Sequence, residues 1–166
     1  MAHRGVHFAL TKEQESRLLS VFGDDDAVLE SVEQIEAAWD KPFLYETDAA
    51  WDAIHRCFCD GKLLYTGGTY PLNHLVCGGR QLIAGDDVGY TVTYVSPEQV
   101  LEIAKAAADV SKEVLAVRYK KIKQRGYDGQ LGPEDFEYAW ENFQGLAEFF
   151  TVAAKAHRAV VSTVDC

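Results

Sequence analysis

Two histidines and two cysteines lie at spacings that could hold a metal ion. His55 and Cys59 are four residues apart in "WDAIHRCFCDGK" (51–62), and His74 and Cys77 are three apart in a later segment. Residues three or four apart share one face of a helix, and zinc binds nitrogen and sulfur ligands in a tetrahedral arrangement. Cys57 and Cys59 lie about 200° apart around a helix, so they cannot bind one metal together. A zinc site of His55, Cys59, His74 and Cys77 is therefore geometrically possible, although the spacing is not a standard zinc pattern.

The same stretch also has the pattern of a buried helix face. Trp51, Ile54, His55 and Phe58 recur at positions i, i+3, i+4 and i+7, which makes one apolar stripe. On such a face we expect His55 to be a core histidine with hydrogen-bond partners and Cys59 to be a small apolar residue. We favour this second interpretation, so the sequence predicts no metal and no cofactor.

A small-molecule site is the alternative use of this stretch. It is expected where Trp51 and His55 face the glycine-rich segment 66–90, because tryptophan supplies a stacking wall and histidine titrates near neutral pH. The predicted lining residues are Trp51, His55, His74, Arg80, Asp87 and Tyr90. Such a cleft would serve a binding module or an enzyme, and no catalytic residue is assigned.

Other catalytic motifs are missing from the sequence. It contains no G-x-S-x-G elbow, no Walker lysine loop and no H-E-x-x-H pair. The segment "TGGTYP" (66–71) could hold an anion on backbone amides, but no phosphate-loop pattern follows it, and a flexible turn is favoured. Asp86 and Asp87 could act as paired carboxylates, but in "AGDDVG" between two expected strands they read as hairpin-turn residues.

Charge is unevenly distributed along the chain, whose formal net charge is −10. Residues 12–60 hold 13 acids and 4 bases, a net charge of −9, while residues 112–125 hold 6 bases and 1 acid, a net charge of +5. Because nucleic-acid binding needs clustered Lys and Arg, the acidic chain is expected to bind no nucleic acid. The basic stretch is expected to be a solvated helix face. An acidic surface suits a basic protein partner.

Hydropathy and cysteine usage indicate a cytoplasmic protein. No run approaches the roughly 18 apolar residues that a membrane span needs, so no membrane association is expected. The segment "MAHRGVHFAL" lacks the features of a signal peptide. Four cysteines in 166 residues without an export signal are most simply free thiols.

Periodicity and capping signals predict one α+β domain over residues 1–166. Capping boxes at Thr11/Gln14 and Ser96/Gln99 start helices that bury Leu18, Leu19 and Phe22, and Val100, Leu101, Ile103 and Ala104, respectively. Further helices are expected at 24–42, 48–60, 71–77, 111–124 and from Gly132 onward, the last with an aromatic stripe. Strands are expected at 4–11, 79–85, 89–96 and 158–165. The predicted architecture is a small mixed or antiparallel sheet of about four strands packed with several helices.

Several short motifs in order resemble the YfbM-like family, a bacterial domain family of unknown function. The matching residues are Trp51, Ile54, His55 and Gly61, then Pro71, Leu72, Gly78 and Gly79, then Gly89, Tyr90, Pro97 and Val100, and finally Phe149, Phe150, Ala153 and Ala154. The resemblance spans about residues 45–165 and is only an outline over the first forty. Cys57 and Cys59 replace the family's usual apolar and small or hydroxyl residues, which argues against a family-wide metal site.

The resemblance implies a protein-binding inhibitor, since members of this family look like they often occur in bacterial toxin and immunity gene clusters, beside other small acidic inhibitors. We therefore predict an immunity-type inhibitor that blocks a basic toxin domain. The predicted docking residues are the helical acids Asp24, Asp25, Asp26, Glu30, Glu33 and Glu36.

Overall fold

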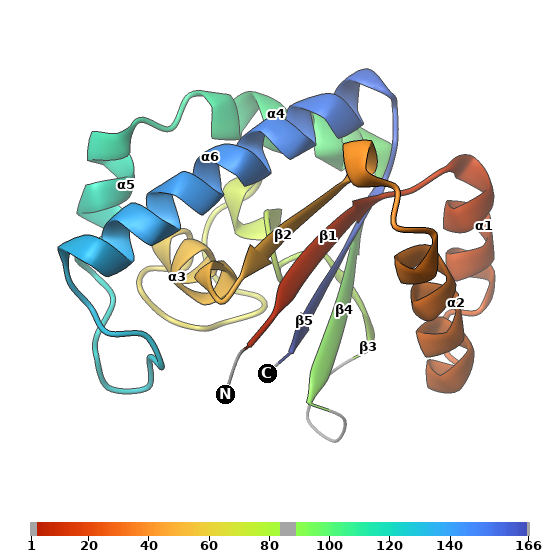
Figure 1. The fold of residues 1–166 in the computed structure, drawn as a ribbon, viewed down its shortest axis with the longest axis horizontal. Helices are drawn as coiled ribbons and strands as arrows, with labels where there is room; N and C mark the ends of the chain where they lie inside the picture. The colour runs from red at the N-terminus through yellow and green to blue at the C-terminus, as the bar shows by residue number, and fades with distance from the viewer. Residues whose placement is uncertain (1–2, 84–88, 166) are drawn as a thin grey trace.

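The computed structural model describes residues 3–83 and 89–165, and this part of the chain contains five strands, six α-helices and two short 3-10 helices (Figure 1). The strands are β1 (Gly5–Ala9), β2 (Leu44–Asp48), β3 (Arg80–Ile83), β4 (Tyr90–Val95) and β5 (Val160–Asp165). The α-helices are α1 (Lys12–Ser20), α2 (Asp25–Ala38), α3 (Ala50–Cys57), α4 (Pro97–Ala108), α5 (Lys112–Tyr119) and α6 (Pro133–Lys155). The 3-10 helices are η1 (Lys41–Phe43) and η2 (Leu72–His74).

The strands form one antiparallel sheet in the order β2-β1-β5-β4-β3. The first and last strands of the chain are neighbours, with Val6 opposite Thr163 and Phe8 opposite Val161. The backbone amide of Asp165 donates to the carbonyl of Arg4 at 3.0 Å, so the chain ends lie side by side (Figure 1). The α+β class and the antiparallel option are confirmed.

The sheet has one strand more than the sequence predicts. The missed strand, β2, reads "LYETD", and only Thr47 in it is buried. Its hydrogen bonds to β1 make it a strand, since it has no clean alternation of apolar and polar residues. This strand also shortens the helix predicted over residues 48–60: α3 begins at Ala50, because Asp48 belongs to β2.

Two helix starts follow the predicted capping boxes. The Gln14 amide donates to Thr11 Oγ1 at 3.1 Å, and the Thr11 amide donates to Gln14 Oε1 at 2.9 Å. Ser96 and Gln99 exchange the same pair of bonds at 3.2 and 2.9 Å. These bonds satisfy backbone donors that the first helical turn leaves free.

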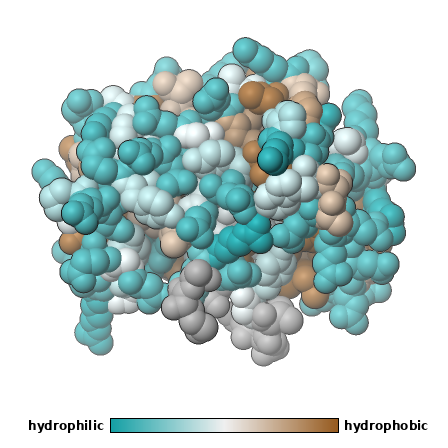
Figure 2. Space-filling model, viewed as in Figure 1, coloured by the Kyte–Doolittle hydropathy of each residue, from teal (hydrophilic) through white to brown (hydrophobic). Residues whose placement is uncertain are grey.

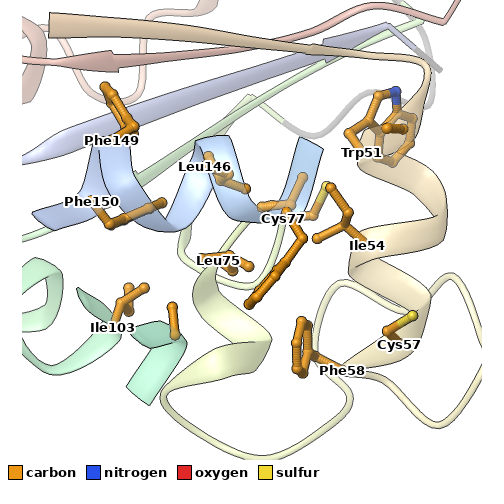
Figure 3. Close-up of a cluster of buried hydrophobic side chains, with 14 of the residues drawn as sticks. Trp51, Ile54, Cys57, Phe58, Leu75, Cys77, Ile103, Leu146, Phe149 and Phe150 are labelled. Carbon is orange, nitrogen blue, oxygen red and sulfur yellow. The ribbon is translucent and has the colours of Figure 1, made fainter. Parts of the chain in front are cut away.

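The sheet lies between two unequal layers of helices (Figure 1). Side chains alternate along a strand, so Val6 and Phe8 pack toward α1 and α2, whereas Ala9 packs toward the larger layer of α3, α4, α5 and α6. Figure 3 shows the centre of the larger core, where Ile54 of α3 points toward Cys77. The ring centroids of Phe58 and Phe143 lie 5.8 Å apart, which joins α3 to α6.

The aromatic stripe of α6 packs as predicted, but two expected core residues do not. Phe143 and Phe150 are buried, and Phe136 and Trp140 are partly buried against the same core. Phe22 is 47% exposed because α1 ends at Ser20 and leaves it in the turn before α2. Leu101 is 46% exposed, since it lies about 100° around α4 from the buried Val100.

The surface in Figure 2 is mostly hydrophilic, with apolar residues in small separate groups. Scattered apolar residues are normal on a folded chain and need no partner. Within residues 3–83 and 89–165, no helix has both the length and the apolar character required to cross a membrane.

Candidate functional site

Three of the four residues of the possible zinc site contact protein groups. His55 Nε2 lies 2.7 Å from the carbonyl oxygen of Leu64, and His74 Nδ1 lies 2.7 Å from Asn73 Oδ1. Cys59 Sγ lies 3.5 Å from His55 Nε2 and 3.6 Å from the Gly67 carbonyl. In the described residues, no group of three or more His, Cys, Asp or Glu side chains is placed to hold a metal ion. The structure therefore does not assemble this site.

The His55–Cys59 contact does not make a nucleophile. Burial raises the pKa of the Cys59 thiol to about 11, and the neighbouring Asp60 adds to this effect. Burial also lowers the pKa of His55. Because the nucleophilic form of cysteine is the thiolate, a buried thiol with a raised pKa beside a neutral imidazole is inert. His55 lies in the core, 1% exposed.

The six residues of the predicted ligand pocket do not lie together. Trp51 belongs to the core beneath α3, whereas Arg80 and Tyr90 face the α1–α2 layer. The Arg80 guanidinium lies 4.0 Å from the ring centroid of Phe22. Alternation along β3 and β4 thus turns these two side chains to the other side of the sheet from Trp51. Asp87 and the expected hairpin turn lie outside the described residues.

The acids of α2 form an outward stripe. Asp24 caps the helix by accepting from the Ala27 amide at 3.2 Å. Asp26, Glu30 and Glu33 follow at steps of four and three, which places them on one face, and all three are exposed. Only Glu36 among the six predicted docking residues has an ion-pair partner in the described chain, Arg4 Nη1 at 3.1 Å. Most of the predicted acidic surface is therefore free to meet another charge.

A groove that the sequence did not reveal runs beside this stripe. It has a volume of about 200 Å³ and is lined by α1 and α2 residues that include Glu13, Arg17, Gln34 and Ile35. It forms because α1 and α2 pack against each other as a hairpin on the sheet. Sequence periodicity identified both helices but gave no information on the space between them.

A second polar region joins α3, α6 and the segment between α5 and α6. Arg56 Nε donates to Asp52 Oδ1 at 2.6 Å, and Arg56 Nη2 donates to the Gly126 carbonyl at 2.7 Å. Burial raises the pKa of Asp52, and the hydrogen bond and charge of Arg56 oppose this effect. A buried pair of this kind needs such extra partners to offset its desolvation.

Asp135 holds the other end of the same region. The hydroxyls of Tyr119 and Tyr127 donate to Asp135 Oδ2 at 2.5 and 2.9 Å. The adjacent cavity, which Asp52, Tyr127 and Asp135 also line, has a volume of about 130 Å³. Since these polar groups already bind one another, we assign them the task of fixing residues 120–132 to α3 and α6.

His7 is a buried histidine that the sequence reading did not single out. Its Nδ1 lies 2.7 Å from Ser162 Oγ, and its Nε2 lies 3.0 Å from Thr47 Oγ1. Burial lowers the pKa of His7 to about 3, so the ring is neutral at physiological pH. His7 and Ser162 are 0% and 5% exposed, which keeps substrates from reaching this pair. The sequence pattern of β1 could not identify this pair, because it does not show which residues of neighbouring strands lie next to His7.

Comparisons with known proteins agree with the resemblance seen in the sequence. The crystal structure of YfbM from Escherichia coli, a protein of unknown function, superimposes with a TM-score of 0.72. That match covers 99% of this chain and 99% of that chain at 12% identity, so it shows a shared fold. No curated protein matches the chain.

The family match extends beyond the segment that carried the resemblance. The family model described as domain of unknown function DUF1877 matches residues 1–163 and therefore includes the first forty residues. The YfbM-like assignment is confirmed: the chain belongs to the DUF1877 family.

Proposed function

We propose that the chain is a protein-binding module whose α1–α2 face docks a positively charged protein. In its specific form, the proposal is an immunity-type inhibitor that covers the active-site face of a basic toxin domain. The observation that carries it is the exposed stripe of Asp26, Glu30 and Glu33, none of which has an ion-pair partner in the described residues.

The stripe works against the stability of α2. Like charges three or four residues apart destabilise a helix by about 0.2–0.5 kcal/mol per pair. Asp25 and Asp26 lie in the first turn, where the helix dipole favours them, but Glu30 and Glu33 lie beyond that turn. Since Glu30 and Glu33 do not stabilise the helix, we infer that they serve binding to a cationic surface.

The α1–α2 face also has a groove and an exposed aromatic side chain, which a binding partner could contact in addition to the acids. Exposed Phe22 lies in the turn between α1 and α2, and the groove between these helices has Glu13 on its wall. An aromatic side chain is a frequent anchor at protein interfaces, and this one lies at the turn end of the helix pair, apart from the groove. Arg17 also lines the groove, so the acids outside it are expected to set the charge preference.

Three buried thiols, Cys57, Cys59 and Cys77, suit a reducing compartment. We therefore place the encounter in the cytoplasm. Charge-led association there should be fast and should weaken with added salt.

The test compares two variants that lose the same charge. Asp26→Asn/Glu30→Gln/Glu33→Gln neutralises the stripe, whereas Glu113→Gln/Glu141→Gln/Glu148→Gln neutralises exposed acids of α5 and α6. Each protein captures partners from a lysate of the source cells, and the captured protein is then purified for binary kinetics. We expect a basic partner whose association rate falls at least tenfold with the stripe variant and less than twofold with the control.

Two results would contradict the proposal at different levels. Equal binding by both variants would show that the α1–α2 face is not the docking surface. A captured partner that binds through the stripe but keeps full activity and toxicity when saturated with this chain would exclude the inhibitor role and leave the binding role intact.

A further inference from the structure

A cavity of about 130 Å³ lies between the end of α3, the glycine-rich loop and α5. Phe58 and Asp60 line one side, Gly68, Thr69 and Tyr70 line a second, and Arg118 reaches it from α5. The loop belongs to the "TGGTYP" segment, and Arg118 belongs to the basic stretch 112–125. Folding thus brings together two motifs that lie about 50 residues apart and that the docking proposal leaves unused.

Arg118 has hydrogen-bond donors to spare. Its guanidinium carbon lies 5.4 Å from the Phe58 ring centroid, and the side chain is half-buried. Arg56 nearby binds both a carboxylate and a carbonyl. No carboxylate or carbonyl of the described chain binds Arg118 in this way. A guanidinium that lies over a ring and has no acceptor in the described residues suits a bidentate oxyanion.

The loop adds backbone donors on the opposite wall. Gly68 has φ +79°, and a Cβ there would lie 2.0 Å from the Phe58 carbonyl oxygen, so glycine lets the loop approach α3 closely. The backbone amides of Gly68 and Thr69 donate to no acceptor in residues 3–83 and 89–165. Successive free amides in a turn form anion-binding concavities.

Charges of both signs lie beside the cavity. Asp60 lines it, Glu102 lies next to the Tyr70 hydroxyl, and Lys121 Nζ lies 3.6 Å from Asp60 Oδ1. Arg118 is the base on the cavity wall, so its guanidinium donors, and not the net charge of the surroundings, supply the attraction for an anion.

We propose that this cavity binds a phosphate group, either free phosphate or a small phosphomonoester. Arg118 takes two phosphate oxygens through its guanidinium, and the Gly68 and Thr69 amides take a third. Tyr70, which is 41% exposed, borders the site and would contact the organic part of an ester. The site is independent of the acidic docking face.

Titration of the folded chain, followed by amide NMR at constant ionic strength, tests this proposal. Inorganic phosphate and phenyl phosphate are the probes. We expect saturable shifts of the Gly68 and Thr69 amides, with at least tenfold weaker binding in Arg118→Gln and less than twofold weaker binding in Arg125→Gln, an exposed residue with the same charge change. Tighter binding of phenyl phosphate than phosphate would assign an ester, and the reverse order would assign the free ion.

The Gly68 and Thr69 amides also make the result independent of one variant. If Arg118→Gln fails to fold, Lys121→Gln replaces it, since losing the charge beside Asp60 should weaken binding several-fold. No saturable shift of these amides with either probe, or equal weakening in Arg118→Gln and Arg125→Gln, would overturn the proposal.

Discussion

Helices α2 and α3 both contact the sheet, but they differ in how much of their surface is exposed to solvent. On α2 the buried residues Val28, Val32 and Ile35 form one stripe, and the remaining faces carry exposed acids. On α3 every residue except Asp52 is buried. A helix with one apolar stripe covers a surface, whereas a helix that is buried on all sides forms the interior.

The comparison also shows how each region treats charge. The charged group inside the larger core, Arg56, has Asp52 and the Gly126 carbonyl as partners. On α2, Asp26, Glu30 and Glu33 are exposed and have no ion-pair partner in the described residues. Buried polar groups must be hydrogen-bonded, so the Arg56 contacts mainly serve stability. The exposed acids of α2 are under no such constraint and can pair with a charge from another molecule.

The largest expected contrast comes from removing one aromatic side chain from each region. Trp51→Ala should lower the free energy of unfolding by about 3–5 kcal/mol, because it empties a buried aromatic site; the side chain is 2% exposed. Phe22→Ala should lower it by about 1 kcal/mol or less, because the ring is 47% exposed and loses its contact with the Arg80 guanidinium. Urea unfolding measures both free energies. Similar losses in the two variants would contradict the difference in burial between Trp51 and Phe22.

A smaller loss is expected at His55. His55→Ala removes the bond to the Leu64 carbonyl and should lower the free energy of unfolding by about 1–3 kcal/mol. His74→Ala, at a half-buried histidine, is the matched control and should lose less. Unchanged stability in His55→Ala would contradict its role as a core histidine and return attention to a ligand role.

Acid should lower the free energy of unfolding through protonation of His7 in the unfolded chain. Its pKa is about 3 in the folded chain and 6.5 in the reference state. Between these values the unfolded chain binds a proton that the folded chain does not, so stability falls as pH drops below 6.5. The contribution is about 1.4 kcal/mol per pH unit. Unfolding of His7→Gln between pH 6 and 4.5 should show a correspondingly shallower slope, and an identical slope would refute this.

The smallest effect is expected on α2 itself. Asp26→Asn/Glu30→Gln/Glu33→Gln should raise the free energy of unfolding by less than about 1 kcal/mol at low salt, because removing two like-charge pairs gains about 0.4–1 kcal/mol and losing Asp26 from the first turn gives part of this back. The gain should shrink at high salt. Thermal unfolding at both salt concentrations checks this, and a clear loss of stability would mean that these acids hold α2 in place.

Local sequence determined the starts of α1 and α4 and the apolar face of several regular elements. The Thr11/Gln14 and Ser96/Gln99 boxes formed as predicted because their partners are three residues apart. The α6 stripe and the alternation of Val6 and Phe8 also depend only on the period of the element. The resemblance to a known family came from such local motifs in order.

Tertiary structure decided everything that depends on partners distant in the chain. "LYETD" became β2 because β1 offered it an edge, and the sheet separated Arg80 and Tyr90 from Trp51. The packing of α5 likewise placed Arg118 beside the glycine-rich loop. Periodicity defines which face of an element is apolar, but the element that meets that face is set by chain topology, which spacing within a short segment does not encode.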